Sequence, residues 1–104
     1  MLRCCLTVFA TWILAGCAST QTDAYEDEYL PYTDDCQSRD DAKFCNKAAI
    51  VAEYHALEAK KAGDVRAARR AFERAADSAQ RACDLGMTDI CEVADLLRAK
   101  HKDL

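Results

Sequence analysis

The sequence predicts an all-α protein built from short antiparallel helical hairpins. After its single proline, Pro31, the chain has only two glycines, Gly63 and Gly86, and it is rich in alanine, which has the highest helix propensity. Apolar residues here recur at alternating three- and four-residue steps, as on the buried face of an amphipathic helix. The connections are short, and short connections make successive helices antiparallel neighbours.

The first predicted helix begins at Asp40 or Asp41, since either side chain can cap its first turn. It runs to about Lys61, whose positive charge suits the negative end of the helix dipole. Gly63 is its stop signal, because glycine readily adopts the left-handed conformation that follows many helices.

Asp64 is the predicted cap of a second helix, which ends near Gly86. Its apolar stripe consists of Val65, Ala68, Phe72, Ala75, Ala79 and Ala82. Thr88 is the predicted cap of a third helix. One face of that helix carries Ile90, Val93, Ala94 and Leu97.

The stretch before these helices, residues 18–32, is polar and acidic. Its tyrosines stand three or four residues apart, and one helical turn could dock them on the domain: Tyr25, Tyr29 and Tyr32. The composition favours a mobile linker instead, and Pro31 disfavours a helix at the residue before it. We therefore expect a tether over residues 17–33 and a helical domain over residues 34–104.

The run Leu14-Ala15-Gly16-Cys17 closes an apolar stretch and resembles the lipobox of bacterial lipoprotein precursors. The apolar stretch, residues 4–15, is too short to cross a bilayer, which takes roughly 20 residues. The resemblance implies that residues 1–16 are a signal peptide and that Cys17 carries covalent lipid, with no other cofactor expected. An ordinary secretory signal with a chance cysteine is the alternative.

The net charge of the chain and the residue after Cys17 limit which partners and which membrane are expected. Removal of residues 1–16 takes away Arg3 and no acid, so the net charge falls from −4 to −5. Such a chain is a poor candidate for nucleic acid, which requires a positive face, and lipid would hold it to the membrane. By the pattern of enterobacterial lipoproteins, alanine rather than aspartate after the lipidated cysteine favours the outer membrane, facing the periplasm.

Four cysteines remain once those of residues 1–17 are set aside, namely Cys36, Cys45, Cys83 and Cys91. An even number of thiols in an exported domain implies disulfides, and the spacing alone leaves three pairings open. Zinc is the alternative, but gaps of eight and seven residues are longer than those of zinc knuckles. We therefore expect disulfides and no metal.

Two spacings indicate a repeat: Cys83 follows Cys36 by 47 residues, and Cys91 follows Cys45 by 46. The segment from Asp64 to Cys91 resembles a cysteine-rich Sel1-like repeat, a relative of TPR helical hairpins. The resemblance implies bridges between Cys83 and Cys91 and, in the first unit, between Cys36 and Cys45. About one and a half units are recognisable, so disulfides or a homodimer must replace the missing burial. The alternative is a disulfide-stapled three-helix domain.

The sequence offers little catalytic chemistry. His55 and His101 have no nucleophile at a motif-like spacing, and we expect both to be solvated. Phosphate loops, His-Glu-x-x-His and Cys-x-x-Cys motifs are missing from the sequence. We therefore do not expect an enzyme.

Arg66, Arg70 and Arg74 form a basic row at four-residue spacing, with Arg69 beside it. Interleaved acids favour a solvated, salt-bridged face. The alternative is a docking surface for an acidic partner or for the chain's own acidic tether.

Together these observations predict a lipid-anchored envelope protein that acts as a protein–protein interaction or scaffold module, with another envelope protein as partner. The alternatives are an accessory to an envelope enzyme and a small structural lipoprotein without a specific partner. A site for catalysis needs convergent polar groups in a pocket, and this sequence offers too few.

Overall fold

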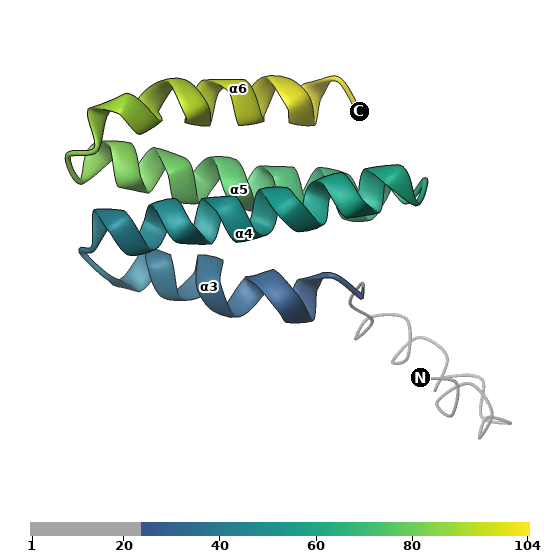
Figure 1. Cartoon of the computed structure of the whole chain (residues 1–104), viewed down its shortest axis with the longest axis horizontal. Coiled ribbons are helices and arrows are strands. Elements are labelled where there is room, and N and C mark those ends of the chain that lie inside the picture. The colour runs from purple at the N-terminus through teal and green to yellow at the C-terminus, as the bar shows by residue number, and fades with distance from the viewer. Residues whose placement is uncertain (1–23) are drawn as a thin grey trace, which may run out of the picture.

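The computed structural model describes residues 24–104, which form two antiparallel helical hairpins lying side by side (Figure 1). The elements are α3 (Glu26–Ser38), α4 (Ala42–Lys61), α5 (Val65–Asp84), the short 3-10 helix η1 (Thr88–Ile90) and α6 (Cys91–Lys102). The first hairpin is α3 and α4, and the second is α5 and α6. The all-α prediction is confirmed over these residues, with four α-helices in place of the expected three. The predicted signal peptide and Cys17 lie outside the described residues.

The ends of α4 and α5 are where the local signals predicted them. The Asp41 carboxylate accepts a hydrogen bond from the backbone N–H of Phe44 at 3.1 Å, and Asp64 caps α5 through Ala67 at the same distance. Gly63 has a φ of +82°, and Gly86, in the connection after α5, has a φ of +117°. Both glycines thus occupy the left-handed region that residues with a Cβ avoid.

The last helix begins later than its sequence predicts. Thr88–Ile90 form one turn of 3-10 helix, and α6 starts at Cys91 without a side-chain cap. The predicted inner face holds nonetheless: Ala94 and Leu97 are buried, and Ile90 and Val93 pack against the same core.

The expectation of a tether over residues 17–33 is wrong from residue 26 onward, because α3 occupies Glu26–Ser38 with Pro31 inside it. Proline in a helix loses the hydrogen bond from its nitrogen to the carbonyl four residues earlier. Here that carbonyl belongs to Asp27, and both residues are exposed, so water can satisfy it. The domain therefore begins about eight residues earlier than predicted.

Buried side chains hold α3 against the rest of the domain. Tyr29, Thr33 and Cys36 follow one another at helical spacing and are almost fully buried. Tyr29 belongs to the main core cluster with the alanines of α4 and α5. The Thr33 hydroxyl donates to backbone carbonyls of its own helix at 3.4 Å. Of the two interpretations of the tyrosines, the helical turn docked on the domain describes this segment better than the mobile linker does.

The core between α4 and α5 consists mainly of alanine. Thirteen of the eighteen buried apolar residues are alanines, and Phe72, Tyr29 and Leu97 are the largest side chains among the rest. A methyl side chain buries little apolar area, but it lets two helix backbones approach closely. The two central helices therefore pack along most of their length through a narrow, closely fitted contact.

The predicted repeat can be compared with the two hairpins of the structure. When the sequence is aligned with itself at an offset of 46 residues, Cys45 aligns with Cys91. At the same offset Ala48 aligns with Ala94, Ile50 with Leu96 and His55 with His101. The sequence predicts about one and a half units, whereas in the structure a helix precedes each second cysteine: α3 comes before Cys45 and α5 before Cys91. Residues 24–104 thus contain two hairpins, in which Cys45 and Cys91 are 46 residues apart and the first helix is 13 residues long in one and 20 in the other.

Each hairpin is closed by a disulfide at its loop. Cys36 in the last turn of α3 bonds to Cys45 in the first turn of α4, and Cys83 near the end of α5 bonds to Cys91 at the start of α6. The Cα atoms are 4.9 Å apart in both pairs. These two separate disulfides are the local pairing that the resemblance implies.

Replacing Cys36 and Cys45 together by alanine should lower the free energy of unfolding by about 2–3 kcal/mol, because the bridge closes a loop of about ten residues. Replacing Cys83 and Cys91 together should lower it by a similar amount for the same reason. The bridges differ in burial, because Cys83 and Cys91 are only partly buried. Because both residues of the first bridge are fully buried, we expect its loss to cost at least as much. Urea denaturation of the two double variants gives the order, and a clearly smaller cost at the first bridge would contradict it.

Candidate functional site

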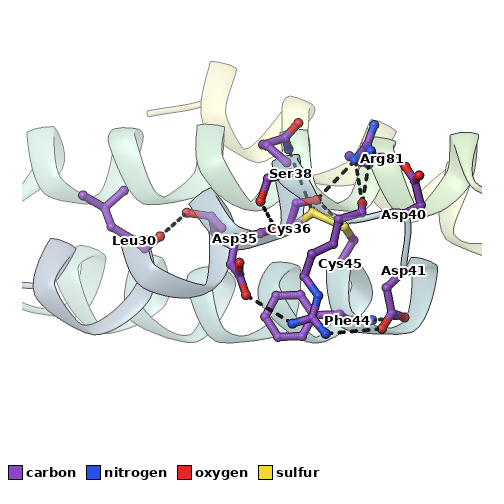
Figure 2. The surroundings of a disulfide bond; sticks show 12 residues. Leu30, Asp35, Cys36, Ser38, Asp40, Asp41, Phe44, Cys45 and Arg81 are labelled. Atoms are coloured by element: carbon purple, nitrogen blue, oxygen red, sulfur yellow. Dashed lines mark hydrogen bonds and ion pairs between the residues drawn. A yellow bond between two sulfur atoms is a disulfide. The ribbon is translucent and has the colours of Figure 1, made fainter.

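Arg81 on α5 joins the two hairpins at the disulfide of the first one. Figure 2 shows its guanidinium reaching the end of α3, where it donates to the backbone carbonyls of Cys36 at 3.2 Å and Arg39 at 3.0 Å. It also pairs with the Asp40 carboxylate at 2.9 Å. The last carbonyls of a helix have no partner within it and attract positive charge. Since α3 has no basic residue in its own last turn, Arg81 supplies the cation from another helix.

The predicted basic row on α5 divides into two parts. Arg70 pairs with Glu26 at 3.4 Å and Arg74 with Asp34 at 2.8 Å, and both acids belong to α3. These arginines hold the acidic segment of the same chain, which is the tether alternative considered for the row. Arg66 and Arg69 are exposed and form no ion pair within residues 24–104.

The most distinctive exposed surface lies on α4, on the side that neither α3 nor α5 covers. Its apolar centre is open to solvent: Ile50 and Tyr54 are each 58% exposed and Leu57 is 40% exposed. Lysines extend the same stripe at both ends. We call this surface the α4 face, and its residues are Lys43, Lys47, Ile50, Tyr54, Leu57 and Lys61.

The steps along the α4 face are four, three, four, three and four residues, so its members form one nearly straight line on the helix. Lys61 pairs only with Glu58 of the same helix, at 3.5 Å, and the ammonium of Lys47 lies 5.8 Å from the ring centre of Tyr32 on α3. Lys43 forms no ion pair among the described residues. The stripe itself contains no acid.

Helix α6 borders the α4 face. Lys100 on α6 pairs with Glu53 on α4 at 3.0 Å, and the two helices run in the same direction (Figure 1). One turn before this ion pair on each helix stand Leu96, which is 61% exposed, and Ile50. All six lysines of the chain lie on α4 and α6, which gives this side its positive charge.

His55 is half-buried among tyrosines and not solvated as expected. The centres of the Tyr25 and Tyr29 rings are each 6.3 Å from its ring, and that of Tyr54 is 5.1 Å away in an edge-on arrangement. These contacts dock the start of α3 onto α4. They assign a packing role to His55.

His101, the counterpart of His55, lies with Arg98 on a shallow groove between α5 and α6. Burial and the nearby Glu73 carboxylate raise the pKa of Asp77, which also lines this groove, while Arg98 and Arg74 oppose the shift. The charges of the groove largely compensate one another. No His, Cys, Asp and Glu group within residues 24–104 is arranged to hold a metal ion.

No helix in the described part of the chain combines the length and apolar character needed to cross a bilayer.

Sequence reasoning missed both the α4 face and Arg81. The α4 face carries a signal, because its 4-3-4-3-4 spacing runs opposite the alanine stripe of the same helix. Arg81 carries none, since its partners lie 41 to 45 residues away in the sequence.

Replacing Arg81 by alanine should lower the free energy of unfolding by about 1.5–3 kcal/mol, because it leaves helix-end carbonyls of α3 without a charged donor. The matched control, Arg74→Ala, removes an exposed ion pair and should cost about 0–1 kcal/mol. Urea denaturation of both variants compares them. Equal costs would show that Arg81 is an ordinary surface cation.

Comparisons with known proteins give no relative for this chain. A scan against protein-family models, a search of curated proteins and a search of solved structures each found no match. The functional argument therefore rests on the sequence and on the surface described above.

Proposed function

We propose that this chain is a lipid-anchored protein of the bacterial envelope, held through Cys17 in the outer membrane and facing the periplasm, whose helical domain is a protein–protein interaction module. The lipobox resemblance of Leu14-Ala15-Gly16-Cys17 supports the address. The two disulfides support it as well, because structural disulfides persist in oxidising compartments such as the periplasm.

The α4 face is the observation that carries the interaction role. Among residues 24–104, four of the six exposed large apolar side chains belong to this face or lie against one of its lysines. They are Tyr32, Ile50, Tyr54 and Leu57. A contiguous apolar patch rimmed by polar residues is typical of a surface that binds another protein. In the basic row, by contrast, Arg70 and Arg74 are paired with acids of α3.

Replacing Cys17 by serine should leave an uncut, unlipidated precursor, because a hydroxyl does not replace the thiol that accepts the lipid. Incorporation of labelled palmitate, together with the size of the chain on a gel, measures this. Cys36→Ser, made in the same way, is the control and should keep its label. Label on the Cys17→Ser protein would contradict the address.

A photo-reactive phenylalanine analogue placed at Tyr54 should form one stoichiometric adduct with another envelope protein in living cells. The same analogue at Arg66, which is exposed on α5, is the matched control and should form none. Adducts at neither position would contradict the interaction role and favour a structural lipoprotein. Equal adducts at both positions would show that the α4 face is not the binding surface.

A further inference from the structure

We infer that the α4 face receives an amphipathic helix of the partner protein, with an apolar centre and acidic residues near both of its ends. This inference rests on the proposed interaction role and deepens it by naming the chemistry of the partner. The α4 face is itself arranged in this way with opposite charge: Ile50, Tyr54 and Leu57 at the centre, lysines at the ends.

The spacing of the α4 face favours a helix as the occupant. Its members alternate steps of four and three residues from Lys43 to Lys61, a stretch of about 27 Å at 1.5 Å per residue. A straight seam of alternating three- and four-residue steps suits a second helix that packs at a shallow crossing angle. An extended peptide would need an unpaired strand edge, and no strand is present among the described residues.

Charge decides which helix fits. Lys43 and Lys47 stand at one end of the face and Lys61 at the other, with no acid between them on the stripe. A partner helix with carboxylates at both ends would complement these charges in either direction. The lysines are exposed, and their contacts within the domain are weak. Lys61 pairs with Glu58 of its own helix, and the Lys47 ammonium lies 5.8 Å from the ring centre of Tyr32.

A second copy of this chain is a poor occupant by the same reasoning. If two α4 faces met, parallel or antiparallel, lysines would oppose lysines at both ends of the contact, and like-charge juxtaposition is costly. An anionic membrane surface is also disfavoured. Helices that lie on membranes carry their lysines along the flanks of a broad apolar face, whereas here the lysines continue the stripe beyond three apolar residues in a chain of net charge −4.

Two labelled helical peptides test the inference against the full chain purified from membranes. Both have three leucines at the centre of a 3.5-residue stripe; one has glutamates at both ends of the stripe and the other lysines. At low ionic strength, where exposed charges are least screened, fluorescence anisotropy should show at least about tenfold tighter binding of the glutamate peptide.

Reversing the charge of the lysines on the α4 face is the decisive experiment. The triple variant Lys43→Glu, Lys47→Glu, Lys61→Glu should invert the preference, while Tyr54→Ser should weaken both peptides. The matched control is Arg66→Glu with Arg69→Glu, two exposed bases of α5 outside the face, which should leave the preference unchanged. All these side chains are exposed, and circular dichroism verifies that each variant is folded.

Four results would overturn the inference. One is a peptide preference that the triple variant does not change. Another is binding to phosphatidylglycerol vesicles that the triple variant abolishes while neither peptide binds, which would assign the face to a lipid surface. The third is self-association in sedimentation experiments that Tyr54→Ser abolishes. An adduct at position 54 in cells, with no charge preference between peptides, would refute this inference and leave the interaction role standing.

Discussion

The close contact between α4 and α5 is the constraint on which the rest of the structure depends. Because it is made of alanines, each buried residue contributes little apolar area, and a small domain has little stability to spare. The structure compensates at the ends of the helices. Disulfides close both hairpins, Arg81 ties the loop of the first hairpin to the second, and Tyr29 brings one large side chain into the alanine core.

Most of the described arginines lie on α5, whereas the lysines lie on α4 and α6. Arginines gather on α5, where Arg70, Arg74 and Arg81 bind acids or carbonyls of the first hairpin with planar, multiply donating groups. Lysines stand only on α4 and α6, where Lys100 alone reaches a neighbouring helix through an ion pair. The arginine side therefore holds the fold together, and the lysine side is left for contacts outside it.

Local signals in the sequence predicted the local structure well. Asp64 begins its helix and Gly63 ends the one before, because a cap and a left-handed residue act within a single turn. Around Pro31 the local signals pointed the wrong way, since acids and a proline disfavour a helix that distant partners nonetheless stabilise. Arg81 is the clearest of those partners, and its contacts depend on how the hairpins pack. The α4 face was hidden for the same reason, because only the packing of α3 and α5 shows which side of α4 stays open.

The early start of α3 also limits how far the domain can travel. With lipid on Cys17, as proposed, only nine peptide steps separate the anchor from Glu26. A chain of that length spans at most about 32 Å when fully extended, which is close to the length of a 20-residue helix such as α4. The start of α3 would therefore stay within about 32 Å of the anchored cysteine. Only partner segments within reach of a domain held this close to the bilayer would contact the α4 face.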